Sequence, residues 1–138
     1  ALALVDAADK KSAPALVRML KAPDTSTPAS KARMETIRLN VGATLLRIDP
    51  ESTAAIQFFT NLLQKEGTTR GRALKALGEI GPKAKGLVPA LIPALKDKSP
   101  FNREEAAVTL GLIGPDAQPA LFALFKLRYE SEGDMPIV

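Results

Sequence analysis

The stretch Arg70–Leu91, RGRALKALGEIGPKAKGLVPAL, recurs further along the chain as Arg103–Leu124, REEAAVTLGLIGPDAQPALFAL. The shift is a constant 33 residues, from 70 to 103 and from 91 to 124. Both copies contain the sequence L-G-x-I-G-P, at 77–82 in the first and at 110–115 in the second. Self-similarity at a period of about 20 to 50 residues is typical of repeat arrays, in which neighbouring units bury their apolar faces against one another.

Each copy has the pattern of two helices joined by a tight corner. Over 70–80, apolar residues recur at steps of three and four, which is the spacing of one helical stripe. Gly81-Pro82 ends this helix, because Gly accepts a backbone conformation that stops a helix and Pro cannot continue one. A second helix is expected over about 84–97, and Pro93 within it predicts a kink near Ile92. The corresponding second helix of the last copy is expected over 116–130.

The same pattern extends toward the N-terminus with less fidelity. A shift of 32 residues places Arg38 on Arg70 and Ile48 on Ile80. We therefore expect about four helical hairpins, with units over about 1–22 (partial), 30–65, 68–97 and 100–130. The chain is interpreted as a single domain and as a fragment of a longer protein, because neither end has the polar outer face of a terminal repeat.

The units are not identical at the glycine positions. Leu46 and Asp49 stand where the later units have Gly78 and Gly81, so the earlier unit should pack and turn differently. Gly78 recurs as Gly111 inside a predicted helix, where Gly costs about 1 kcal/mol relative to Ala. Both glycines therefore predict a close approach between helices near the corner.

The repeat, R-x-x-A-x-x-x-L-G-x-I-G-P followed by A-x-x-x-V-P-A-L-I, resembles HEAT repeats, including the short-repeat branch with the phycobilisome-lyase HEAT-like group. The resemblance implies an all-α fold, an α-α superhelix in the form of a right-handed solenoid whose second helices line a concave, partner-binding face. An Asp that pairs with the Arg of neighbouring repeats is present as Asp97, whereas Gln64 stands one unit earlier, so no continuous ladder is expected. The structural positions of the repeat are Arg38, Arg70, Arg103, Gly78, Gly111, Gly81, Gly114, Pro82 and Pro115.

The composition excludes several kinds of chemistry. With no Cys, the chain has no disulfide, no thiolate nucleophile and no cysteine metal site. With no His, it lacks the commonest general base and a common transition-metal ligand. No run of the sequence approaches the ~20 apolar residues that span a bilayer, so a water-soluble chain without membrane insertion is expected. The net charge of +4 comes from charges of alternating sign, which is typical of a solvated surface.

Two local features have a structural and a functional interpretation. Glu66–Arg72 combines Gly, Thr hydroxyls and two Arg at a helix start, a combination that can bind an anion, but Arg70 is also the repeat arginine. Phe58 cannot share the centre of one helical stripe with Phe59. It is therefore expected either between repeats or exposed as an anchor for a partner.

These observations favour a non-catalytic scaffold for protein–protein interaction, binding a partner with an acidic surface as a monomer, without a cofactor or metal. The exposed positions expected to bind that partner lie on the second helices: Gln57, Asn61, Lys65, Lys85, Lys96, Lys126 and Arg128. One branch of the resemblance implies instead a bilin lyase-like chromophore-attachment factor. Nucleic-acid binding, as in HEAT-like DNA glycosylases, is disfavoured because such readers need stacking aromatics, and the chain has no Trp and one Tyr, Tyr129.

Overall fold

The computed structural model of the chain describes residues 10–23 and 27–131, and within them the side chains of 11–23 and 27–126. Every regular element in these ranges is a helix, which confirms the all-α class. The first nine residues of the expected partial unit over 1–22 lie outside the described residues. With η denoting a 3-10 helix, the elements are η1 (Lys10–Ser12), α2 (Ala13–Lys21), α3 (Pro28–Ile48), α4 (Thr53–Gln64), α5 (Thr68–Ile80), η2 (Gly81–Leu87), α6 (Val88–Leu91), η3 (Pro93–Lys96), α7 (Pro100–Ile113), η4 (Gly114–Ala120) and α8 (Leu121–Ser131).

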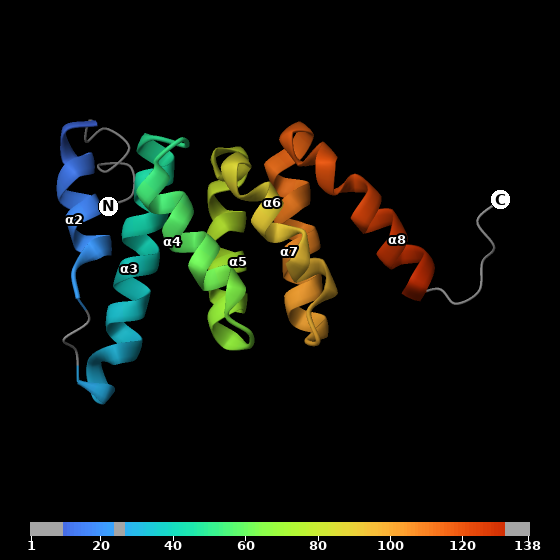
Figure 1. Cartoon of the computed structure of the whole chain (residues 1–138), viewed down its shortest axis with the longest axis horizontal. Coiled ribbons are helices and arrows are strands. Elements are labelled where there is room, and N and C mark those ends of the chain that lie inside the picture. Colours follow the sequence, from blue (N-terminus) through green and yellow to red (C-terminus); the bar gives the residue numbers. More distant parts are fainter. Residues whose placement is uncertain (1–9, 24–26, 132–138) are drawn as a thin grey trace.

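The hairpins are arranged one after another along the molecule. In Figure 1 the first helices α3, α5 and α7 follow one another along the long axis, and the second-helix elements α4 and α6 cross in front of them. α2 packs against both α3 and α4. The helix pairs span 28–64, 68–96 and 100–131, where hairpins were expected over 30–65, 68–97 and 100–130. The result is a HEAT-like solenoid, as the repeat predicted.

The hydrophobic core runs lengthwise through this array. The buried apolar residues form one cluster that extends from Leu39 in α3 to Ala120 at the end of η4. Equivalent positions of the two closest copies are buried alike: Leu77 and Leu110 are 0% and 1% exposed. Each hairpin therefore closes its core against the neighbouring hairpin rather than around one centre.

The corners between paired helices depend on glycine in two units and on aspartate in a third. Gly81 and Gly114 adopt positive φ angles of 56° and 83°, which side-chain-bearing residues rarely adopt. Asp49, at the equivalent position after α3, has an extended backbone with φ −141°. Its Oδ1 accepts a hydrogen bond from the N–H of Glu51 at 3.0 Å. The corner after α3 therefore turns differently, as the substitution of Gly by Asp predicted.

The prediction of one continuous second helix over 84–97 is wrong. That segment is the end of η2, the single α-helical turn α6, and η3. Prolines at 82, 89 and 93 have no N–H to donate and disturb the i to i−4 ladder, so tighter 3-10 turns replace much of it. The interruption expected near Ile92 is present, since α6 ends at Leu91 and η3 begins at Pro93. In the last unit, η4 contains Pro119 and delays the α-helix to Leu121.

The close approach predicted at both Gly78 and Gly111 is wrong for Gly111, and at Gly78 the neighbouring helix lies at ordinary contact distance only. A Cβ placed on Gly78 would lie 3.4 Å from Thr109 Oγ1, an ordinary van der Waals distance, whereas a Cβ on Gly111 would meet nothing within 4 Å. The difference arises because Gly78 faces α7, the next first helix, whereas Gly111 faces an open hollow that is lined by residues of η4 and α8. The glycine spacing therefore predicted where the equivalent helix faces lie, but not whether another helix packs against them.

Closer approaches occur at other glycines. A Cβ on Gly42 of α3 would lie 3.0 Å from the rings of both Phe58 and Phe59 on α4. A Cβ on Gly71 of α5 would lie 2.8 Å from Oδ1 of Asn102 on α7. These two glycines allow α3 to pack against α4, and α5 against α7, at distances that no side chain would permit.

Candidate functional site

The three repeat arginines all form hydrogen bonds within the protein. Each one donates a hydrogen bond to a backbone carbonyl at the end of the preceding second-helix element, where helical carbonyls lack an internal partner. The guanidinium of Arg38 reaches the carbonyl of Ala22 after α2 at 2.7 Å. Arg70 Nε reaches Leu63 near the end of α4 at 2.6 Å, and Arg103 reaches the carbonyl of Asp97 after η3 at 2.7 Å. The arginines therefore join consecutive hairpins.

A buried polar network connects the two closest copies of the repeat. The carboxylate of Asp97 lies 2.5 Å from Nη1 of Arg70 and accepts hydrogen bonds from the N–H of Ser99 at 2.8 Å and from Nδ2 of Asn102 at 3.1 Å. Burial alone would raise the pKa of Asp97, but the hydrogen bonds from Ser99, Arg70 and Asn102, together with the charge of Arg70, hold it below 3.8. This network is a structural joint, because its groups satisfy one another.

Glu66–Arg72, the segment considered for anion binding, uses both of its arginines within the protein. Arg70 is bonded to Asp97 and Leu63. Nη1 of Arg72 lies 3.4 Å from Oε2 of Glu35. The helix there begins at Thr68, with Gly67 preceding it. The arrangement matches the structural interpretation of this segment.

The residues expected to bind a partner are distributed over the second-helix elements. Gln57, Asn61 and Lys65 are exposed on or directly after α4, Lys85 and Lys96 are exposed on η2 and η3, and Lys126 is exposed on α8. The side chain of Arg128 lies outside the described residues. The structure brings Asn61 and Lys65 together at one groove, and the other described residues of this set do not line it.

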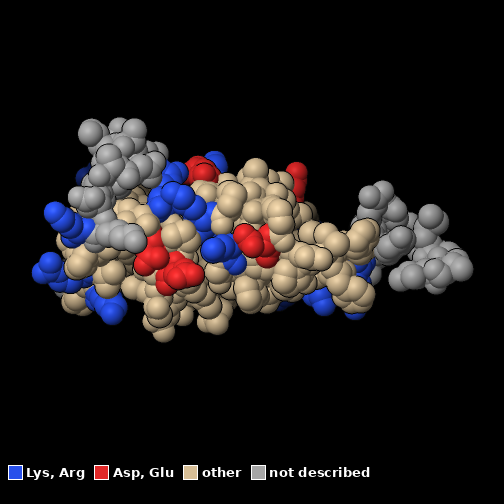
Figure 2. Space-filling view, turned by 90° about the horizontal axis from the view of Figure 1, so that it is seen from above, with Lys and Arg blue, Asp and Glu red and all other residues tan. Residues whose placement is uncertain are grey.

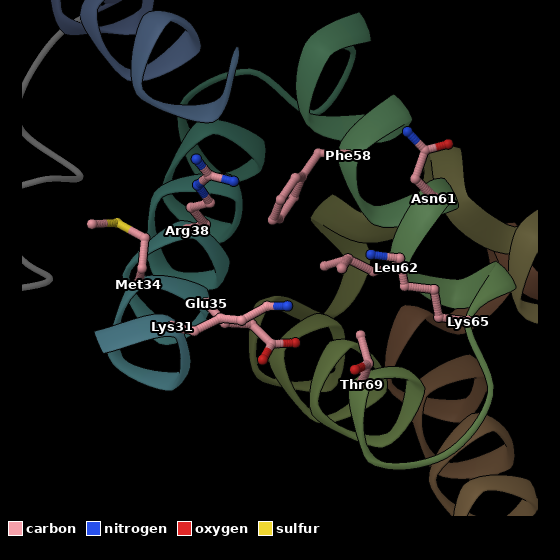
Figure 3. A pocket seen from close by; sticks show the side chains of 9 residues that line it. All are labelled: Lys31, Met34, Glu35, Arg38, Phe58, Asn61, Leu62, Lys65 and Thr69. Atoms are coloured by element: carbon pink, nitrogen blue, oxygen red, sulfur yellow. The ribbon is translucent and has the colours of Figure 1, made fainter. Parts of the chain in front are cut away.

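That groove lies between α3, α4 and the start of α5 and encloses about 390 Å³. Figure 3 shows Phe58 and Leu62 pointing from α4 into the space opposite α3, with Arg38 at its upper edge and Lys31 and Glu35 on its lower side. The lining residues are Lys31, Met34, Glu35, Arg38, Phe58, Asn61, Leu62, Lys65 and Thr69. Of these, only Asn61 and Lys65 were expected to bind a partner, and Phe58 was considered as an exposed anchor. Arg38 was expected as a structural repeat position and Thr69 within the segment considered for anion binding, and the remaining lining residues were missed.

The groove follows from unequal helix lengths. α3 has 21 residues, whereas α5 and α7 have 13 and 14, and the extra turns of α3 lie at its N-terminal end. α2 has only 9 residues, and the carbonyl bound by Arg38 belongs to Ala22, directly after its last residue. The second-helix layer is therefore open beside the first turns of α3. The long apolar spacing of α3 and the polar connection before it were the available sequence signals.

The charges around the groove are predominantly positive. Lys31, Arg38 and Lys65 contribute cations, and the carboxylate of Glu35 is shared with Arg72. The Nε of Arg38 is buried and has no hydrogen-bond partner within the described residues. A buried guanidinium donor without an acceptor is costly, and a carboxylate is its strongest partner.

A second distinctive surface lies on the last hairpin and is apolar. Seen from above, charged side chains of both signs intermingle over the middle of the molecule, and the side with the last hairpin is mostly uncharged (Figure 2). Its exposed large apolar residues are Phe101, Val108, Leu112, Leu121, Phe122 and Phe125.

This apolar surface belongs to Pro100–Lys126, a stretch of the described residues that is long and apolar enough to span a membrane by length and composition. The expectation that no stretch would qualify is therefore wrong on composition. In the fold, however, Gly114-Pro115 divides the stretch into α7 and a second arm, and its buried side chains, such as Leu110 and Ile113, belong to the common core. Core helices of globular proteins can have the same length and hydropathy.

Among the described residues, no group of three His, Cys, Asp or Glu side chains could hold a metal ion. The family described as HEAT repeats matches residues 56–132, which is more than half of the chain. No curated protein and no solved structure matches the chain.

Proposed function

Because the chain belongs to the HEAT-repeat family, whose repeats generally mediate protein–protein interactions, we propose that it is a non-catalytic scaffold that binds a partner along its second helices. Solenoids suit this role because stacked hairpins present an extended surface larger than that of a globular domain of equal size. The partner is a protein with an acidic surface, and the scaffold binds it as a monomer.

The main observation that supports this proposal is a contrast between polar side chains that have hydrogen-bond partners within the protein and polar side chains that have none within its described part. The repeat arginines of the first helices are all bonded to the ends of neighbouring elements. By contrast, the exposed side chains of Gln57, Asn61, Lys65, Lys85 and Lys96 make no hydrogen bond or ion pair within the described part of the chain. The fold does not use this row of polar groups, so it is available to a partner.

Site-specific photo-crosslinking in the source cell tests the proposal. A benzophenone amino acid at Gln57 or Lys85 should give discrete crosslinked products, because both positions lie on the second-helix side. The matched control places the same group at Lys75 or Glu79, which are exposed on the first helix α5. Equal products from both pairs, or none from either, would contradict a binding surface on the second helices.

A further inference from the structure

We propose that the groove between α3 and α4 is the anchor site for an acidic segment of the protein partner that carries one aliphatic or aromatic side chain. The apolar side chain enters between Phe58 and Leu62, and flanking carboxylates pair with Lys31, Arg38 and Lys65. This inference rests on the proposed function and names the chemistry of the partner at one place on the scaffold.

The inner wall of the groove is apolar and fixed in position. Phe58 packs edge to face on the core residue Phe59, with ring centroids 5.3 Å apart and an interplanar angle of 74°. Gly42 lets both rings approach α3 closely, since a Cβ there would lie 3.0 Å from each of them. Leu62 is 8% exposed and Met34 is 37% exposed, so apolar surface continues from the wall to the rim. A wall held by the core needs little ordering when a ligand side chain binds.

The rim of the groove is suited to carboxylates. Three cationic side chains surround the apolar wall, and the single acidic one, Glu35, lies 3.4 Å from Arg72 outside the groove. The buried Nε of Arg38 has no acceptor among the described residues. A carboxylate beside the guanidinium of Arg38 would gain the strength of a charge-assisted interaction. The charge of the rim is thus complementary to Asp or Glu beside the anchor residue.

The size and position of the groove match one segment of a protein chain. Its volume of about 390 Å³ falls at the lower end of the range of about 300 to 1,000 Å³ that is usual for pockets binding small ligands. It opens where α2 ends, so a partner segment would extend the second-helix layer beside the first turns of α3.

Fluorescence anisotropy with defined peptides tests the inference. The probe is a fluorescein-labelled peptide, GEEDLEEDG, added to the full chain at 150 mM salt. A peptide with Ala in place of Leu should bind about tenfold more weakly, because three buried carbons are lost. A peptide with Gln and Asn in place of Glu and Asp should also bind about tenfold more weakly, because the rim then lacks its ionic partners.

Variants of the protein locate the binding. Lys31→Glu combined with Lys65→Glu should weaken binding of the acidic peptide about tenfold or more, by reversing two rim charges. The matched control, Lys75→Glu combined with Lys98→Glu, makes the same change in net charge at exposed positions outside the groove and should alter affinity by about twofold or less at this salt concentration. Met34→Glu should also weaken binding, and because Met34 is exposed, the substitution leaves the buried core unchanged.

The outcomes separate this inference from the proposed function. Equal binding of the Leu and Ala peptides, or equal weakening by the control pair, would overturn the groove as an anchor and indicate general attraction to a basic protein. Equally potent displacement of the peptide by a single-stranded oligonucleotide would also overturn it. If crosslinks persist at Gln57 while no peptide binds, the scaffold proposal stands without this anchor. If the peptide binds and no crosslinks form, only the anchor stands.

Discussion

The two closest copies of the repeat, Arg70–Leu91 and Arg103–Leu124, share an interior and differ in their surfaces. Leu77 and Leu110 are equally buried, and both first helices end at a glycine with positive φ. On the exposed side of α5 the chain has Arg72, Lys75 and Glu79, whereas the same positions of α7 carry Glu105, Val108 and Leu112. The interior is repeated because every hairpin must close its core in the same way. The surface residues differ because each hairpin has different surroundings.

The joints between hairpins differ in the same manner. Arg70 has two partners: the carbonyl of Leu63, which connects α5 to the end of α4, and the buried carboxylate of Asp97, which connects α5 to the end of η3. Within the described residues, Arg103 donates its hydrogen bonds only to the carbonyls of Asp97 and Lys98. The joint at Arg70 is the stronger one, and it should account for more of the stability of the array. Changes at equivalent positions of the two copies test this comparison.

Removing the same core side chain from each copy should have the largest effect. Leu77→Ala and Leu110→Ala should each lower the free energy of unfolding by about 3 kcal/mol, since both side chains are fully buried and leave a cavity. Urea denaturation followed by circular dichroism measures both. Comparable losses are expected from equal burial. A loss below about 1 kcal/mol for Leu110→Ala alone would mean that the copy containing Leu110 is not packed like the copy containing Leu77.

Breaking the buried joint should have the next largest effect. Asp97→Asn should cost about 2 to 3 kcal/mol at pH 7, because the buried guanidinium of Arg70 loses its counter-charge. The pKa of Asp97 is depressed in the folded state, so its contribution is complete above the unfolded value of 3.8 and is lost as the pH falls through the lower folded value. The wild type should therefore lose stability below pH 3.8 more steeply than the variant does.

Glu35→Gln is the matched control for that joint. The Glu35–Arg72 pair is longer, at 3.4 Å, and its arginine side chain is 51% exposed. Exposed ion pairs contribute about 0 to 1 kcal/mol, so the variant should unfold almost like the wild type. A loss as large as that of Asp97→Asn would contradict the distinction between a buried and an exposed joint.

The sequence predicted the features that repeat and missed those that depend on neighbours. The helix pairs and the Gly-Pro corners follow from apolar spacing and local backbone chemistry, which a single copy already contains. The 3-10 turns of η2 and η3 were missed because the apolar spacing of 84–97 remains helical while its prolines, each tolerable alone, act together on the backbone.

The groove was predicted only in part, for a related reason. Asn61 and Lys65 were recognised as exposed positions of a second helix, which is a property of α4 alone. Lys31, Met34 and Arg38 line the same groove only because α2 ends early beside a long α3. That relation between two helices is absent from any one repeat, so a comparison of copies could not predict it.

Alanine substitutions at three glycines sharpen the comparison at smaller magnitude. Gly111→Ala should stabilise the protein by about 0.5 to 1 kcal/mol, because the added methyl meets open space and Ala favours a helix. Gly71→Ala should destabilise it by about 1 to 2 kcal/mol, because the methyl would lie 2.8 Å from the buried, bonded Asn102. Gly78→Ala should fall between them. Thermal unfolding ranks the three, and a destabilised Gly111→Ala would show that this face of α7 is covered.

The smallest expected effect on stability comes from exchanging one exposed residue between the copies. Val108 is 50% exposed, and Lys75 is exposed at the same position of the first copy. Val108→Lys should change the free energy of unfolding by less than about 0.5 kcal/mol, because an exposed side chain loses few contacts and Lys favours a helix slightly more than Val. Lys75→Val, the reverse exchange, should be equally mild. Retention on a hydrophobic column should fall for the first variant and rise for the second. If Val108→Lys instead cost more than about 1 kcal/mol in a concentration-dependent way, the apolar side of α7 would be buried between copies of the chain in solution, and the difference between the two surfaces would mark an interface.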